Sequence, residues 1–237
     1  MIDLGGLQFS EETLIADKLA VVGSTGSGKT YVTRKIINQA GMQVIIFDLD
    51  GEYQFGTKKP LEFGFLERPE WAGEYYAKHP TKNCVIDHRR RDFERNMNEC
   101  RDFVIALYDA KREKKYQTPT LFVIEEAYYY APEKGVPSPK GVVKGTSEYA
   151  LFTVQARGRK RGIGAIILTQ RPAQCSKHVL GQCTKWLIFR MNLPNDLVWL
   201  RQQGFERELV GQVKSLKTGE CVAVGFQDDP FTVQVSP

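Results

Sequence analysis

Residues 23–30 read Gly-Ser-Thr-Gly-Ser-Gly-Lys-Thr, and this GxxxxGK[ST] pattern constrains the fold more than any other stretch of the chain. The apolar run at 19–22 before it predicts a short strand, and residues 31–40 after it have helical spacing. The pattern binds phosphate when a strand precedes it and a helix follows it. The sequence therefore predicts a nucleotide-phosphate site at residues 23–30.

Each residue type in the pattern has a role in binding phosphate. Glycines lack side chains, so backbone N–H groups can close on phosphate oxygens, and the positive end of the following helix faces the same anion. We expect Lys29 to reach the β- and γ-phosphates and the Thr30 hydroxyl to bind Mg²⁺. The predicted phosphate-binding residues are Gly23, Ser24, Thr25, Gly26, Ser27, Gly28, Lys29 and Thr30.

Apolar strands alternate with helical segments along the chain, which is typical of an α/β protein with a mostly parallel sheet. A polar lead-in at 1–18 allows a short strand pair, and 54–82 reads as irregular. Without an internal repeat, low-complexity run or clear linker, residues 1–237 are predicted to form one domain. The expected strands are 19–22, 43–47, 84–87, 120–124, 165–169, 185–190 and a terminal hairpin of 220–226 with 231–235; the expected helices include 92–111, 147–161 and 196–203.

Composition places few further limits on the chain. Apolar residues make up 42% of the 237 residues, yet no run approaches the roughly 18–20 residues that a membrane span needs. The start lacks the basic and apolar regions of a secretory signal, and the five scattered cysteines contain no CxxC pair. These features favour a reducing, cytoplasmic setting. The net charge of +5 permits nucleic-acid binding without requiring it.

Paired acids follow the apolar run at 120–124 and form the second chemical feature. A P-loop protein that cleaves phosphate needs an acid near Mg²⁺ and a second carboxylate for the attacking water. We assign Glu125 to the Mg²⁺ shell and Glu126 to the water. Asp48 and Glu52 follow the strand at 43–47 and can add carboxylates near the metal; ordinary turn chemistry explains them equally well.

Two further polar positions belong to the same region of sequence. Gln170 ends the strand at 165–169, where a glutamine can contact the attacking water or the γ-phosphate. Arg157, Arg159 and Arg161 lie at the end of the preceding helix, which should finish at the opposite edge of the sheet. Such an arginine could reach the phosphate of a neighbouring copy; the alternative is a basic helix end favoured by the helix dipole.

In combination, these blocks resemble the HerA/FtsK superfamily of ring-forming, DNA-translocating ATPases. The P-loop at 23–30 is unspecific alone, whereas the ordered set is specific. Residues 47–53 look like the HerA-type D-x-x-G-E-Y signature, and 123–128 stand where the family has its Walker B motif. Residues 158–164 followed by 168–172 are similar to the family's R-x-x-G…TQRP block. The resemblance covers nearly the whole chain.

The resemblance implies a RecA-like core, a homohexameric ring, ATP hydrolysis between subunits, and duplex DNA in a central pore. By position it makes Lys29 and Thr30 the Walker A pair, Glu126 the catalytic glutamate and Gln170 the sensor. Arg159 is the candidate finger acting on the neighbouring subunit. Glu125 replaces the usual Walker B aspartate, which leaves weak or absent hydrolysis open.

A translocase must accept any sequence, so its DNA contacts should go mostly to phosphates. The basic loop at 129–144 is the candidate pore loop, with a surface loop without function as the alternative. Two other functions stay open: a P-loop kinase or transferase, and a non-hydrolysing ATP-binding assembly factor. The expected location is cytoplasmic, or the host cytoplasm for a viral or plasmid protein, and a recruiting or nuclease partner is unidentified.

Overall fold

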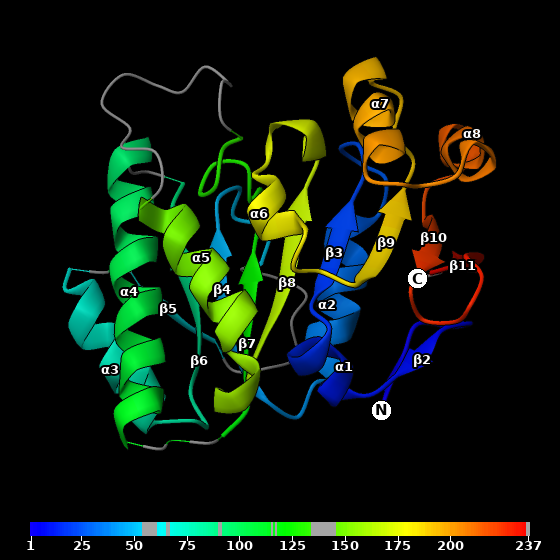
Figure 1. The fold of residues 1–237 in the computed structure, drawn as a ribbon. Helices are drawn as coiled ribbons and strands as arrows, with labels where there is room; N and C mark the ends of the chain where they lie inside the picture. Colours follow the sequence, from blue (N-terminus) through cyan, green and yellow to red (C-terminus); the bar gives the residue numbers. More distant parts are fainter. Residues whose placement is uncertain are drawn as a thin grey trace.

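A computed structural model describes most of the chain, and its core is one nine-stranded sheet with the order β11-β10-β9-β3-β8-β7-β4-β6-β5 (Figure 1). Strands β9 through β5 in this order are parallel, and β10 and β11 form an antiparallel hairpin at one edge. The predicted α/β class with a C-terminal β-hairpin is confirmed. The described residues are 1–53, 61–64, 67–89, 92–114, 116, 118–133 and 146–235.

The strands are short and most follow the apolar runs of the sequence. A separate two-stranded pair, β1 and β2, precedes the sheet, as the polar lead-in allowed. The bounds are β1 (Ile2–Asp3), β2 (Gln8–Phe9), β3 (Leu19–Val22), β4 (Gln43–Asp48), β5 (Leu61–Gly64), β6 (Asn83–Asp87), β7 (Thr120–Ile124), β8 (Ile163–Thr169), β9 (Lys185–Phe189), β10 (Glu220–Val224) and β11 (Phe231–Gln234).

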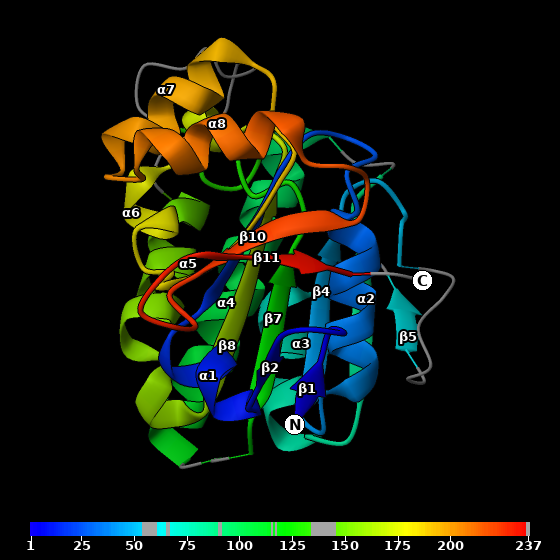
Figure 2. The same ribbon diagram turned by 90° about the vertical axis from the view of Figure 1, so that its right-hand side faces the viewer.

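Helices cover both faces of the sheet (Figure 2). Helix α2 lies on one face, and α3, α4 and α5 lie on the other (Figure 1). No helix in the described ranges is both long and apolar enough to cross a membrane. The bounds are α1 (Glu11–Ala16), α2 (Lys29–Gln39), α3 (Pro69–Lys78), α4 (Phe93–Lys114), α5 (Thr146–Arg157), α6 (Lys177–Leu180), α7 (Pro194–Gln202) and α8 (Arg207–Ser215), with 3₁₀ turns η1 (Arg159–Arg161) and η2 (Pro172–Gln174).

The continuous apolar strands are explained by two cores, one on each face of the sheet. Successive side chains of a strand point to opposite faces. In β3, Leu19 and Val21 therefore join the core under α2, whereas Ala20 and Val22 join the core under α3–α5. A strand buried on both faces reads as an unbroken apolar run, and this is how the sequence predicted the central strands.

Two of the sequence predictions are corrected by the structure. Residues 54–82 are not irregular throughout, because β5 and α3 lie within them; Pro69 opens α3 and its aromatic residues obscure the helical spacing. The helix expected at 147–161 ends at Arg157, and a 3₁₀ turn follows Gly158. A Cβ at Gly158 would lie 2.0 Å from the carbonyl oxygen of Val154, so only a residue without a side chain fits between α5 and the 3₁₀ turn. Helix α8 was not predicted.

The strand order decides which segments meet at the functional edge. Strand β8 lies between β3 and β7 and is parallel to both. The carboxyl ends of parallel strands open at the same edge of a sheet, where ligands of such sheets bind. The P-loop after β3, the acids after β7 and Gln170 after β8 therefore gather at one edge.

Candidate active site

The P-loop connects the end of β3 to the start of α2. Its glycines adopt positive φ angles, with 155° at Gly23, 72° at Gly26 and 117° at Gly28. Side-chain-bearing residues rarely adopt these conformations, which is the local reason for the glycine pattern. Lys29 is buried at the first position of α2, and its Nζ donates to the carbonyl oxygen of Ser24 at 3.2 Å. The lysine thus folds back over the loop that would hold the phosphates.

The neighbouring strand β9 and the turn before β10 support the P-loop from one side. Ser24 donates its N–H to the carbonyl oxygen of Arg190 at 2.8 Å, and Gly219 donates to the carbonyl oxygen of Ser27 at 2.9 Å. A Cβ at Gly23 would lie 2.5 Å from the Cβ of Phe189. The loop can pack this closely on β9 only because position 23 carries no side chain.

Glu126 and Gln170 meet at the same edge. The Glu126 carboxylate accepts the backbone N–H of Gln170 at 3.0 Å, and the Gln170 side chain contacts the hydroxyl of Thr25 in the P-loop. Burial raises the pKa of Glu126, while this hydrogen bond and the charge of Lys29 oppose the rise. Burial likewise lowers the pKa of Lys29, opposed by Glu126 and other nearby carboxylates. Lys29, Glu126, Gln170 and Thr25 therefore form one constellation.

Glu125 faces the turn after β4. One carboxylate oxygen accepts the N–H groups of Leu49 at 3.1 Å and Asp50 at 3.2 Å. Burial, followed by a hydrogen bond to Asp48, raises the pKa of Glu125 to about 10. Glu125 and Asp48 thus form a hydrogen-bonded pair of buried carboxyl groups beside the turn after β4.

Asp48 organises the same turn with both of its carboxylate oxygens. They accept the N–H groups of Gly51, Glu52 and Tyr53 at 2.8 to 3.0 Å. Within the described part of the chain, no three His, Cys, Asp or Glu side chains converge as a metal cluster. The metal roles of Asp48, Glu125 and Thr30 therefore stay predictions.

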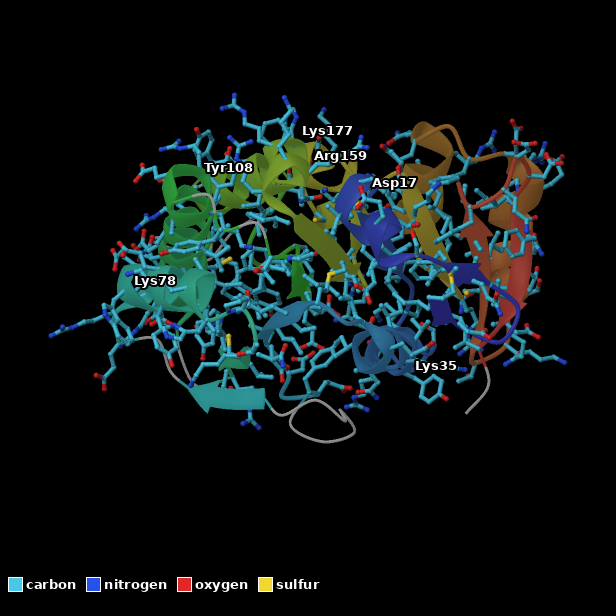
Figure 3. All side chains as sticks on the ribbon, turned by 90° about the horizontal axis from the view of Figure 1, so that it is seen from below. Asp17, Lys35, Lys78, Tyr108, Arg159 and Lys177 are labelled. Carbon is cyan, nitrogen blue, oxygen red and sulfur yellow. The ribbon has the colours of Figure 1, made fainter. Side chains whose placement is uncertain are left out.

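Arg159 lies at the edge of the sheet away from the P-loop, which Figure 3 views directly. It sits in η1 just before β8, and its charge adds to the effect of burial in lowering the pKa of Lys18, which precedes β3. The seven residues of β8 separate this edge from Gln170, a span of roughly 20 Å. Arg157 and Arg159 are exposed, whereas Arg161 lies over the ring of Tyr108. Arg159 cannot reach the P-loop of its own subunit.

Sequence reasoning missed two charged residues near the constellation. Asp50, on the turn after β4, acts electrostatically on both Lys29 and Glu126. Arg171 follows Gln170 and acts on Glu126 and on the buried Asp196 of α7. Asp50 lies in the segment 47–53 after β4, and Arg171 follows Gln170 after β8. Their positions just after strand ends were the signal in the sequence that could have identified them. The candidate pore loop is described only from 129 to 133, and its residues 134–144, including three lysines, lie outside the described residues.

A P-loop between a buried strand and a helix, with a glutamate and a glutamine on adjacent parallel strands, defines a P-loop NTPase. Residues 8–127 match the family described as the central domain of helicase HerA. The chain belongs to this family, and the resemblance stated from its motifs is confirmed.

Curated relatives are archaeal helicases. The chain is 30% identical over 114 residues to a probable helicase of Methanocaldococcus jannaschii, covering 47% of this chain and 20% of the relative. It is 27% identical over 174 residues to the DNA double-strand break repair helicase HerA of Pyrococcus furiosus, covering 70% of this chain and 27% of the relative. The chain thus spans about a fifth to a quarter of these proteins.

Solved structures share the fold over nearly the whole chain. The genome packaging NTPase B204 of Sulfolobus turreted icosahedral virus 2, in complex with sulfate, superposes with a TM-score of 0.65 at 20% identity, covering 92% of this chain and 96% of B204. VirB4 of Thermoanaerobacter pseudethanolicus gives 0.66 at 11% identity, covering 100% of this chain and 93% of VirB4. At these identities the likeness concerns the fold alone.

Proposed function

We propose that this chain hydrolyses ATP at the P-loop and uses the energy to move along duplex DNA as a ring of six copies. The observation that carries the proposal is the convergence of Lys29, Glu126 and Gln170 from three parallel strand ends. Membership of the HerA family and the named roles of its relatives in DNA repair and genome packaging support the DNA part. The proposed location is the cytoplasm of a cell or of an infected host.

The geometry gives each residue of the constellation a role in hydrolysis. The raised pKa of Glu126 makes its carboxylate a stronger base toward the attacking water. The backbone N–H of Gln170 aims that carboxylate, while the side chain touches Thr25 of the loop that holds the phosphates. Lys29 would leave the Ser24 carbonyl for phosphate oxygens, which are stronger acceptors because they are charged.

Mg²⁺ fits this site as a companion of the nucleotide. Magnesium is usually held by one or two carboxylates, several waters and substrate phosphates rather than by a protein cage. Thr30 follows Lys29 in the first turn of α2, whereas Glu125 and Asp48 already accept backbone N–H groups. We therefore expect Thr30 to be a direct ligand and the two acids to act through water. The metal would neutralise charge on the phosphates.

Arg159 is proposed to complete the site of the adjacent copy. Its position at the far edge of the sheet makes it useless to its own P-loop, while its exposure leaves it able to contact another protomer. An arginine supplied by a neighbour stabilises the charge of a phosphoryl-transfer transition state. DNA contacts are proposed for the loop at 129–144 apart from Tyr130, Ala131 and Pro132, which the structure buries, and should go to phosphates without sequence preference.

One observation favours a second candidate function, that of a non-hydrolysing ATP-binding assembly factor. Glu125 stands where the family has an aspartate, and one of its carboxylate oxygens already accepts the N–H groups of Leu49 and Asp50. A carboxylate engaged by its own backbone is less available to a metal ion. Nucleotide would then stabilise an assembly without being cleaved.

The test is the ATP turnover rate with and without blunt duplex DNA, together with the solution mass in each nucleotide state. We expect DNA-stimulated turnover by a hexamer. Glu126→Gln should lower the turnover by about 100-fold or more while ATP binding persists, because the base is removed and the P-loop is intact. The matched control is Glu208→Gln, which changes an exposed carboxylate on α8 and should leave turnover unchanged.

Each alternative function has its own outcome in these measurements. ATP that binds but is never cleaved, with or without DNA, would replace the motor by an assembly factor. A monomer with turnover that ignores DNA would instead favour a kinase or transferase. Unchanged hydrolysis by Glu126→Gln would move the base to another residue.

A further inference from the structure

Three polar side chains meet in the interior between α4 and the sheet. They are His88 directly after β6, Glu99 in α4 and Tyr130 in the turn after β7, with exposed fractions of 1%, 5% and 0%. Burying polar groups costs free energy unless they are paired. No step of the proposed hydrolysis uses them, so their presence needs another explanation.

The contacts link these three residues in a row. His88 Nδ1 lies 2.7 Å from the Tyr130 hydroxyl, and His88 Nε2 lies 3.4 Å from a carboxylate oxygen of Glu99. The Tyr130 hydroxyl and His88 Nδ1 thus share one short hydrogen bond, whereas Nε2 faces the Glu99 carboxylate without forming a hydrogen bond to it. The other carboxylate oxygen of Glu99 accepts from Arg95 at 2.9 Å.

The main chain of His88 is held on two sides. Its N–H donates to the carbonyl oxygen of Asp48 at 2.9 Å, and its own carbonyl oxygen accepts from the side-chain amide of Asn96 in α4 at 3.0 Å. The His88 backbone is therefore anchored between the end of β4 and α4, and the buried ring extends from this anchored position to the Tyr130 hydroxyl.

Tyr130 closes the turn that begins at the proposed base. Glu126 has a φ of 45°, a left-handed conformation that costs a non-glycine residue free energy and persists only where surrounding contacts impose it. The turn is short, since Tyr129 donates to the carbonyl oxygen of Glu126 at 2.9 Å and Tyr130 to that of Ala127 at 3.1 Å. The Tyr130 hydroxyl extends from this turn into the row of buried polar groups.

We propose that His88, with Glu99 behind it, is a brace that holds the Glu126 turn through the hydroxyl of Tyr130. The three are positioning residues, because none of them reaches the reacting atoms. The brace itself is a structural inference; its effect on turnover rests on the proposed function. It explains why a histidine and a glutamate are buried where apolar residues would otherwise fill the core.

The primary variant is Tyr130→Phe, which keeps the ring that packs on Phe47 and removes only the hydroxyl. Amide hydrogen exchange should become at least severalfold faster in peptides that cover 125–131 and 169–171, while peptides of α2 stay unchanged. Glu99→Gln should produce a smaller change in the same peptides. The control is Tyr108→Phe, which keeps the ring beneath Arg161 and should alter neither region.

A second measurement separates positioning from general stability. With ATP as substrate, Tyr130→Phe should lower kcat about tenfold while the ATP dissociation constant stays the same, because misplacing a reacting group slows chemistry without weakening phosphate binding. Adding His88→Gln to Tyr130→Phe should lower kcat little further, since the contact is already lost.

The two measurements fail independently of each other. If the wild-type chain does not hydrolyse ATP, the proposed function falls, and localised exchange in Tyr130→Phe still supports the brace. If exchange is unchanged in 125–131, or rises equally throughout the chain, the brace is overturned even where ATP hydrolysis is normal. A kcat that falls only in proportion to a loss of ATP binding would also overturn it.

Discussion

Gln170 shows how one residue can join two parts of a site, because its backbone and side chain have different partners. The backbone N–H holds the Glu126 carboxylate, and the side chain contacts the Thr25 hydroxyl. A shift of the P-loop on nucleotide binding would therefore be transmitted to the Glu126 carboxylate through Gln170. The sequence predicted that Gln170 lies at a strand end, but it could not predict this double contact.

At the same scale, Lys18 predicts a pH dependence of stability. Its side chain is 2% exposed and its Nζ donates to the carbonyl oxygens of Ile15 and Ile163. Burial lowers the pKa of Lys18 to about 8, whereas the unfolded chain holds this proton up to a pH of about 10.4. Between these values the unfolded state binds more protons at Lys18, so this residue contributes a rise of the free energy of unfolding with pH. The buried thiols of Cys100, Cys175, Cys183 and Cys221, whose pKa burial raises, contribute in the opposite direction, so the effect of Lys18 is read as the difference between wild type and a Lys18 variant.

Urea unfolding at pH 7.5, 8.5 and 9.5 measures this effect. The contribution of Lys18 is at most about 1.4 kcal/mol per pH unit, and Lys18→Met should remove it. Lys111, whose pKa burial also lowers to about 8, should contribute in the same direction as Lys18 in both proteins. Lys214→Met, at an exposed position of α8, should leave the slope intact. An identical slope in wild type and Lys18→Met would contradict the assignment.

At the scale of elements, the packing of α3 on α4 depends on one residue without a side chain. A Cβ at Gly73 would lie 2.4 Å from the carbonyl oxygen of Phe103 and 2.9 Å from the Cβ of Ala106. Real Cβ atoms do not approach backbone so closely, so the two helices would have to separate. Helix α3 was missed in the sequence, yet it makes one of the close helix contacts of the fold.

Gly73→Ala should therefore destabilise the protein by about 1–3 kcal/mol, as overpacking does, without changing nucleotide affinity. The matched variant is Gly211→Ala in α8, where no atom lies within 4 Å of the added Cβ. That change should stabilise the protein by about 0.5–1 kcal/mol, since alanine favours helix more than glycine does. Chemical denaturation measures both, and equal effects of the two variants would refute the packing explanation.

At the scale of the whole molecule, the two edges of the sheet carry complementary halves of one proposed site. Lys29, Glu126 and Gln170 lie at the carboxyl edge, and Arg159 lies at the other. A single copy cannot bring them together across β8. The proposed ring would supply the missing half from the next copy.

The organisation of residues 1–237 as one domain stays a prediction.

Mixing two inactive variants tests this arrangement. Arg159→Ala should lower ATP turnover by about 1,000-fold with nucleotide binding intact, and Lys29→Ala should abolish binding. Mixed assemblies contain interfaces in which an intact P-loop faces an intact arginine, so turnover should partly return. Lys160→Ala, the exposed neighbour, serves as the control and should remain active. A mixture that stays inactive would exclude action of Arg159 across subunits.

Much of the fold and of the candidate site could be read from local sequence. The central strands are unbroken apolar runs because both faces are buried, and the P-loop is recognisable because its backbone angles require glycine. Helix α3 was missed because aromatic residues obscure its periodicity, whereas α8 was overlooked although Leu209, Val210 and Val213 have helical spacing. The roles of Asp50 and Arg171 were not predicted, because these residues act electrostatically on Lys29 and Glu126, which are distant from them in sequence.

The sequence by itself determined the class of fold, the phosphate loop and the family, since each depends on short-range patterns of residue type. Only the tertiary structure decided that β8 lies between β3 and β7, which brings Gln170 between the P-loop and Glu126. It also decided that Glu125 faces Asp48 and that His88, Glu99 and Tyr130 meet. Pairing of distant segments arises from the packing of the whole chain, and no local pattern of residues records it.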